Sequence, residues 1–232
     1  MKTPVIVLVI IFVGCGVKNE RDAERDTLSY NDTTAISDEA DSIYATPADG
    51  PEIRSALATL INAQASKPTR HFTLRLSASG YKYRTDEVWT FDSLLTLSHC
   101  YQDWHSDGTE GNSHHFFRQE RLYAMKEEST TDGEKEISIY HAELGGIRYA
   151  DFANQKDTVV ETLNKKYLTN SENELKTRFA KIVTLLQENQ KGLSDGDPAT
   201  LRIENDSVDE EMPGKEITEI TVDRKLLRKL LK

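Results

Sequence analysis

The chain contains few of the residues that mark several protein classes. Its 232 residues include only two cysteines, six prolines and twelve glycines. So few cysteines exclude a disulfide-dense scaffold, and so little glycine and proline excludes collagen-like and proline-rich architectures. With 37% hydrophobic and 29% charged residues, the chain is not a multi-span membrane protein.

An excess of positive charge is also missing. There are 29 lysines and arginines against 39 aspartates and glutamates, which gives a formal net charge of −10 at pH 7. An acidic protein is repelled by phosphate backbones, so we expect no nucleic-acid partner. We also find no convincing catalytic set, and expect neither an enzyme nor a cofactor.

The first residues form an export signal. Lys2 is followed by ten residues, Pro4 to Val13, that carry no charge and almost no polarity. As a helix this run is about 15 Å long, too short for a bilayer core of roughly 30 Å. This run is therefore typical of the apolar segment of a signal peptide.

The end of this run, Phe12-Val13-Gly14-Cys15, resembles the lipobox of bacterial lipoproteins, with Phe12 where the family usually has leucine. The resemblance implies cleavage after Gly14 and attachment of acyl chains such as palmitate to Cys15, which anchors the protein to a membrane. An ordinary secretory signal with an incidental cysteine is the alternative. Gly16, with no acid at this sorting position, favours the outer over the inner membrane of the cell envelope. Cys100 would then be the only free thiol, expected as a small buried hydrophobe.

Three segments follow from this pattern. Residues 1–14 are the signal peptide, and residues 15–50 are the lipidated cysteine with a disordered tether. Residues 51–232 are a single α+β globular domain. The tether is polar and acidic with isolated apolar residues, so it buries too little surface to offset its ordering entropy. We expect the tether to hold the domain away from the membrane. The alternative is a segment that binds a partner and folds on contact.

From residue 70 to 152 the apolar residues recur with a period of two, which is typical of β-strands. Turn signals such as Asp107-Gly108 and Asp132-Gly133 separate the strands. The connections are too short for parallel crossovers, so consecutive strands must pair antiparallel. We therefore predict an antiparallel meander of about seven strands, with residues 201–203 and 217–222 able to add a hairpin.

Helical patterns flank the strands. An apolar stripe after Pro51 predicts a helix that ends before Pro68, and residues 157–168 and 171–190 are predicted as two further helices. Ser171 and Glu174 match a capping box at the start of the last of these. We expect this helix to cover the apolar face of the sheet. The basic segment 223–232 is expected to lie against the domain with its cations outward, or to contact lipid headgroups.

The stretch 113–149 resembles hairpins of uncharacterised exported bacterial proteins, a likeness that transfers no activity. The aromatic residues of the strand region could line a cleft for lipid or glycan, although large aromatics on a sheet more often form the core. They are Tyr81, Tyr83, Trp89, Phe91, Tyr101, Trp104, Phe116, Phe117 and Tyr123.

Four of the six histidines lie between residues 99 and 115. Asp103 and His105 share a side of their strand, and a hairpin loop at 107–111 would bring one of them near His115. Two imidazoles and a carboxylate could hold Zn²⁺ with an open position. The simpler interpretation is a polar strand end at the rim of the sheet.

Three functions remain open at this point. The first is a membrane-anchored envelope lipoprotein whose domain is a non-catalytic binding or scaffolding module. The second is a lipid or lipoprotein carrier with an apolar groove between sheet and helix. The third is a metal-dependent hydrolase at Asp103, His105 and His115, with a bound water as nucleophile.

Overall fold

The structure is a computed structural model that describes residues 50–66, 71–151, 158–206 and 214–232. The strands are β1 (Phe72–Gly80), β2 (Tyr83–Phe91), β3 (Leu97–Ser106), β4 (Thr109–Arg118), β5 (Arg121–Thr131), β6 (Glu134–His141), β7 (Gly145–Asp151), β8 (Thr158–Leu163), β9 (Ala199–Asp206) and β10 (Lys215–Val222). The helices are α1 (Gly50–Ala65), α2 (Lys165–Glu188), a short 3₁₀ turn η1 (Gln190–Gly192) and α3 (Arg224–Leu230). Of the predicted signal peptide and tether, Gly50 alone is described, as the first residue of α1, and Cys15 lies outside the described residues.

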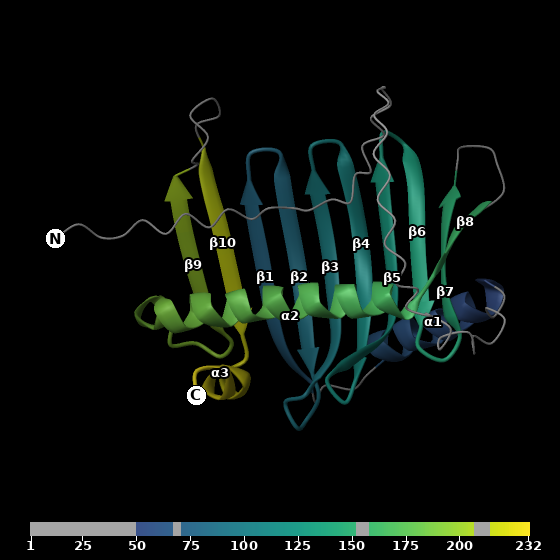
Figure 1. Cartoon of the computed structure of the whole chain (residues 1–232). Coiled ribbons are helices and arrows are strands. Elements are labelled where there is room, and N and C mark those ends of the chain that lie inside the picture. Colours follow the sequence, from purple (N-terminus) through teal and green to yellow (C-terminus); the bar gives the residue numbers. More distant parts are fainter. Residues whose placement is uncertain (1–49, 67–70, 152–157, 207–213) are drawn as a thin grey trace, which may run out of the picture. The chain divides into compact units, whose positions relative to one another are not determined.

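All ten strands belong to one antiparallel sheet, in the order β8-β7-β6-β5-β4-β3-β2-β1-β10-β9. The first eight strands form a meander, and the β9–β10 hairpin returns to pair β10 with β1 (Figure 1). The α+β class with an antiparallel sheet is thus confirmed. The predicted number of about seven strands is too low for the whole sheet, which has ten: seven fall between residues 72 and 151, the predicted hairpin is present as β9 and β10, and β8 was not predicted.

β8 occupies a segment that the sequence predicted as helix. Its Thr-Val-Val-Glu-Thr-Leu sequence is rich in β-branched residues, which favour an extended chain, and it pairs with β7 at the edge of the sheet. α2 therefore begins only after Asn164, whose side chain accepts hydrogen bonds from the backbone N–H groups of Lys166 and Tyr167. The predicted capping box is wrong, because Ser171 lies buried inside α2.

Two-residue turns fix the register of the central hairpins. The predicted turns at Asp107-Gly108 and Asp132-Gly133 are confirmed, and all four residues have positive φ. Gln119 and Glu120 form a similar turn without glycine, with φ of 52° and 62°. Turns with two positive φ values match the twist of antiparallel strands.

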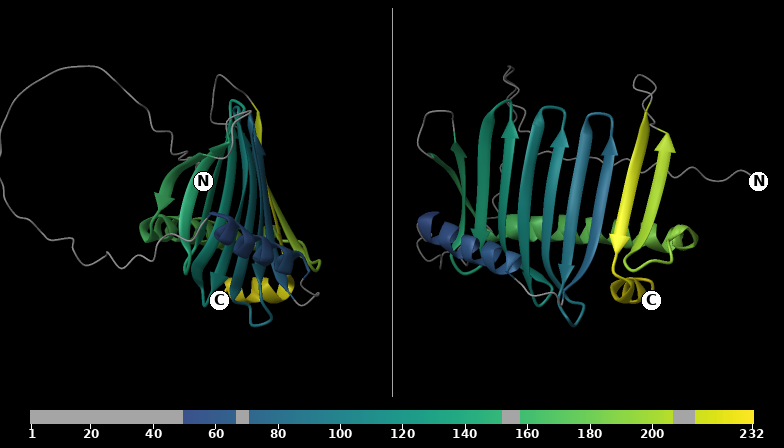
Figure 2. Two further views of the ribbon diagram at one scale, coloured as in Figure 1. Left: turned by 90° about the vertical axis from the view of Figure 1, so that its right-hand side faces the viewer. Right: turned by 180° about the vertical axis from the view of Figure 1, so that it is seen from behind.

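The helices cover both faces of the sheet. α2 runs across the strands on one face, here called the α2 face, while α1 packs on the other, here called the α1 face (Figures 1 and 2). The main hydrophobic core lies on the α2 face, where Leu74, Trp89 and Met125 meet Leu175, Ile182 and Leu186 of α2. A smaller core on the α1 face joins Ile53 and Leu57 of α1 to strands β4 to β7.

α3 closes the chain against the main core. Leu226 and Leu227 are buried, and the positive side chains between them and the C-terminus are exposed, as the sequence indicated for this segment. Within the described ranges, no helix is both long enough and apolar enough to cross a membrane.

Candidate functional site

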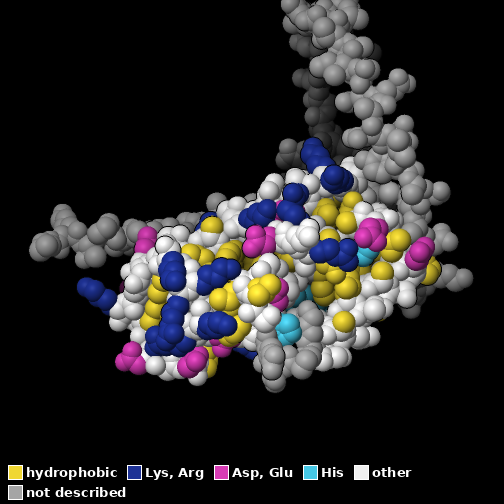
Figure 3. All heavy atoms as spheres, turned by 90° about the horizontal axis from the view of Figure 1, so that it is seen from below, with side chains coloured by type: hydrophobic (Ala, Val, Ile, Leu, Met, Phe, Trp, Pro, Cys, Tyr) yellow, Lys and Arg dark blue, Asp and Glu magenta, His cyan; other side chains and the backbone are white. Residues whose placement is uncertain are grey.

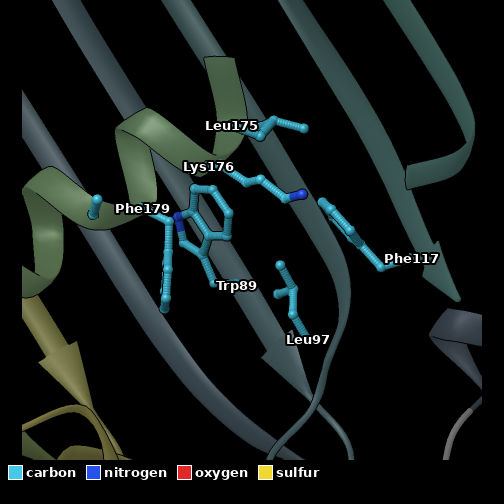
Figure 4. Close-up of a pocket in the computed structure, with 7 residues that line it drawn as sticks. Trp89, Leu97, Phe117, Leu175, Lys176 and Phe179 are labelled. Carbon is cyan, nitrogen blue, oxygen red and sulfur yellow. The ribbon is translucent and has the colours of Figure 1, made fainter. Parts of the chain in front are cut away.

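The α2 face contains a small apolar pocket between the helix and the sheet. Trp89, Leu97 and Phe117 line it from strands β2, β3 and β4. Leu175, Lys176, Phe179 and Ala180 reach it from α2, as Figure 4 shows for the first three. The pocket has a volume of about 120 Å³. It reaches the surface at Lys176 and Ala180, whose side chains are exposed.

The strand register brings the pocket residues to one face. Trp89 pairs with Cys100 across β2 and β3, and irregularities after Thr90 and Phe116 place Leu97 and Phe117 on the same side. On α2, Leu175 and Phe179 are one helical turn apart and therefore point the same way. The ring of Phe179 lies 5.2 Å from that of Trp89, tilted by 44°. The pocket walls are thus part of the packed core.

The size of the pocket limits what it can hold. Most ligand pockets have volumes of about 300–1,000 Å³, whereas a dry apolar cavity of roughly 150 Å³ takes a ring the size of benzene. A cavity of about 120 Å³ therefore fits an apolar side chain or the end of an acyl chain, but not a whole lipid.

A buried ion pair joins α2 to the sheet beside the pocket. Glu87 of β2 has a fully buried side chain, and its Oε1 pairs with the guanidinium of Arg178. Its Oε2 accepts a hydrogen bond of 2.9 Å from the indole N–H of Trp89. Both oxygens of the carboxylate are therefore satisfied away from water, which a buried charge requires.

A second polar cluster lies near the start of α2. The hydroxyl of Tyr167 donates to Oε2 of Glu127 at 2.6 Å, and Nε2 of His115 lies 3.3 Å from Oε1. Burial pushes the pKa of Glu127 upward. The hydrogen bonds from His115 and Tyr167, together with the charges of His115 and Arg148, outweigh burial and leave this pKa below its ordinary value. Burial and the charge of Glu127 raise the pKa of Tyr167 strongly, so its hydroxyl keeps the proton.

A third polar contact joins α2 to the start of β5, just after the β4–β5 turn. Oε1 of Glu172 pairs with Arg121 at 2.8 Å and with Lys176 at 2.5 Å. Its Oε2 accepts from the backbone N–H of Leu122 at 3.3 Å. Together with the other two clusters, this contact ties the first half of α2, from Tyr167 to Arg178, to the sheet.

Cys100 lies opposite His115 in the β3–β4 pairing, an arrangement reminiscent of a thiol beside a base. The thiol is fully buried, and burial raises its pKa well above the ordinary value. A reactive cysteine needs the opposite shift, so Cys100 has the properties of a small core residue. Nδ1 of His115 is buried without a hydrogen-bond partner among the described residues.

The predicted metal ligands do not come together. The turn is confined to Asp107-Gly108, so His105 pairs with Glu110 and His115 pairs with Cys100. Asp103 and His105 therefore lie exposed on the α1 face, while His115 is buried on the α2 face. The expectation that one of them lies near His115 is wrong, because residue parity places the sheet between them. In the described part of the chain, no three His, Cys, Asp or Glu side chains are grouped to hold a metal ion.

The structure instead joins two other histidines, which the sequence interpretation missed. His99 and His114 lie on the α1 face, with Nε2 of His99 3.2 Å from Nδ1 of His114. The ring of Phe116 lies 4.9 Å from that of His99, and the ring of Tyr101 lies 4.8 Å from that of His114. Burial lowers the pKa of His114, and the nearby charge of Lys126 lowers it further. The alternation of His99 with Tyr101 and of His114 with Phe116 was the available signal.

The aromatic residues divide between core and surface. Trp89, Phe91, Phe116 and Phe117 are buried, and Tyr83, Tyr101, Trp104 and Tyr123 are half-buried. Trp104 lies against Gly111 of the neighbouring strand, where an added Cβ would come within 2.5 Å of the indole ring. Of the aromatic set, Trp89 and Phe117 line the pocket.

Comparison of the chain with protein-family models, with curated proteins and with solved structures gives no match.

Proposed function

We propose that the protein is a lipid-anchored component of the bacterial envelope whose folded part is a non-catalytic binding module. The lipobox-like sequence ending at Cys15 supports the anchor. The observation that supports binding is the apolar pocket under α2, which opens at Ala180 and Lys176. Its partner would be an envelope protein that inserts one apolar side chain.

The polar contacts of α2 favour a fixed binding surface. Arg178 with Glu87, Tyr167 with Glu127, and Glu172 with Arg121 hold the helix on the sheet. A site formed by a helix that is held in this way is preorganised, which lowers the entropy that binding must overcome.

The alternative is a lipid or lipoprotein carrier, which the same pocket supports because it leads into the core between sheet and helix. A carrier would have to lift α2, because the present pocket is too small for an acyl chain of ordinary length. Solvent extraction of the purified soluble domain, without the lipid anchor, followed by mass spectrometry separates the two functions. A stoichiometric lipid would support the carrier, and its absence would support the fixed binding module.

Photo-cross-linking in cells tests the binding site. A photoreactive residue at position 180 of the full chain should give a discrete protein adduct, whereas one at exposed Thr184 on the same helix should not. Leu97→Trp, which fills the pocket, should suppress the adduct at position 180. Equal adducts from both positions, or an adduct that the filled pocket leaves unchanged, would contradict the proposal.

A further inference from the structure

A basic helix and an exposed leucine lie together at one end of the sheet. α3 and the two residues after it carry five cations, Arg224, Lys225, Arg228, Lys229 and Lys232. Leu94, in the turn between β2 and β3, is 81% exposed. Figure 3 views this end of the molecule and shows Lys and Arg side chains gathered over α3, with apolar surface beside them. We call α3 with residues 92–96 and 231–232 the basic end.

The cations of α3 are held outward by the packing of the helix. Leu226 and Leu227 are buried in the main core and Leu230 packs against it, so the lysines and arginines of this short helix lie on its outward side. Arg224 is used internally, since its guanidinium donates to the carbonyls of Gly196 and Ser194. The other four cations are exposed.

The turn that carries Leu94 is fixed as well. Oδ1 of Asp92 accepts hydrogen bonds of 2.9 Å from the backbone N–H groups of both Leu94 and Thr96. Leu95 adopts a φ of 62° and packs against the core, which leaves Leu94 pointing into solvent. Nζ of Lys229 donates to the carbonyl of Leu95 at 2.7 Å, so the leucine turn and the basic helix form one surface.

We propose that the basic end contacts the anionic headgroups of a lipid bilayer, with Leu94 entering the interface. The whole chain carries a net charge of −10, so an anionic surface repels most of it. Screening limits these interactions to about 8 Å at physiological salt. Within the basic end five cations stand against one side-chain carboxylate, Asp92, while Asp195 and Asp197 lie at its border beside Arg224. A cationic surface around one protruding apolar side chain matches the chemistry of headgroups above acyl chains.

This inference goes beyond the proposed function, because it does not depend on the lipid at Cys15 or on the pocket. It can be tested without the anchor. Residues 45–232 form one compact unit that contains both hydrophobic cores, so a chain starting at residue 45 keeps the basic end. The readout is cosedimentation with vesicles of phosphatidylglycerol mixed with phosphatidylcholine, compared with vesicles of phosphatidylcholine alone.

We expect binding to the anionic vesicles only, and loss of binding when salt rises from about 0.1 M to about 1 M. Arg228→Gln with Lys232→Gln removes two cations whose side chains form no hydrogen bond or ion pair with the described residues. The double variant should lower the partition coefficient about 25-fold, since each cation near such a surface contributes about fivefold. Leu94→Ser should lower it about tenfold by removing the inserted side chain.

Matched variants at the opposite end of the strands serve as controls. Lys82→Gln with Arg84→Gln removes the same charge, and Tyr81→Ser removes the other large hydrophobic side chain that is exposed in the described part of the chain. These variants should bind as the parent does, with all variants checked for unchanged urea midpoints. Equal binding to neutral and anionic vesicles, or equal loss in the control variants, would overturn the proposal. Retention on polyglutamate without binding to anionic vesicles would also overturn it, and would assign the basic end to an acidic protein.

Discussion

Arg178 of α2 forms an ion pair with Glu87 of β2, a carboxylate whose side chain is completely buried. The indole N–H of Trp89 donates a hydrogen bond to the other oxygen of Glu87. Glu87 therefore links α2 to Trp89, a residue that lines the pocket. This contact fixes α2 over the sheet at the position where the pocket forms.

Breaking this pair should destabilise the fold strongly. Arg178→Met leaves Glu87 buried without its charged partner, which typically costs about 3–5 kcal/mol. Adding Glu87→Leu should recover much of the loss, because the double variant leaves no uncompensated charge. Urea unfolding measures both, with the exposed Lys181→Met on the same helix as a control within about 0.5 kcal/mol. A loss for Arg178→Met as small as that of the control would show that the pair does not hold α2 in place.

Tyr167→Phe should destabilise the protein in a pH-dependent way. It removes a 2.6 Å hydrogen bond to the Glu127 carboxylate, and bonds to charged groups contribute about 1.5–3 kcal/mol. The lowered pKa of Glu127 in the folded state means that its carboxylate stabilises the fold above the unfolded value of 4.5, and that this stability is lost as pH falls below it. The difference in unfolding free energy between the variant and the parent should therefore be larger at neutral pH than at about pH 3.5, and should shrink as pH falls below 4.5. The same difference at both values would argue against an ionised Glu127 as acceptor.

Protonation of His114 should lower the free energy of unfolding in mild acid. Burial lowers its pKa in the folded state below the ordinary 6.5, so the unfolded chain binds the proton more tightly. Stability should therefore fall as pH drops below about 6.5. His114→Gln should flatten this slope, whereas His105→Gln, on an exposed side chain of the neighbouring strand, should leave it unchanged. Urea unfolding between about pH 5 and pH 7.5 gives the comparison. An unchanged slope in His114→Gln would contradict this assignment.

The packing of α1 on the sheet should make a measurable contribution to the free energy of unfolding. Leu57 is 1% exposed among the strands of the α1 face, so Leu57→Ala should cost about 2–5 kcal/mol. Ala58→Ser, at the next and exposed position, provides the matched control in the same urea experiment. Similar unfolding free energies for the two variants would mean that α1 does not add to the core.

The sequence was sufficient to predict the central strands. Alternating residues such as Leu74 and Leu76, together with turns such as Asp132-Gly133, specify both the strands and their antiparallel pairing. The same patterns could not predict β8, because its extended conformation depends on pairing with β7 as well as on its β-branched residues.

The pocket could not be derived from local patterns. Trp89 and Phe179 are far apart in the chain, and only the path of α2 across the sheet brings their rings to 5.2 Å. The predicted proximity of Asp103 or His105 to His115 was wrong for a related reason. A turn confined to Asp107-Gly108 sets the β3–β4 register, and that register decides which face His115 occupies.

Attachment to a membrane through Cys15 is the central claim, because it places the binding module in the envelope. Cells that produce the full chain should be labelled with radioactive palmitate, beside cells that produce Cys15→Ser. The account predicts that the wild-type protein is labelled, lacks residues 1–14 and fractionates with membranes, and that Cys15→Ser carries no label. Label on the Cys15→Ser protein, or a wild-type protein that keeps Met1 and remains in the cytosol, would contradict it.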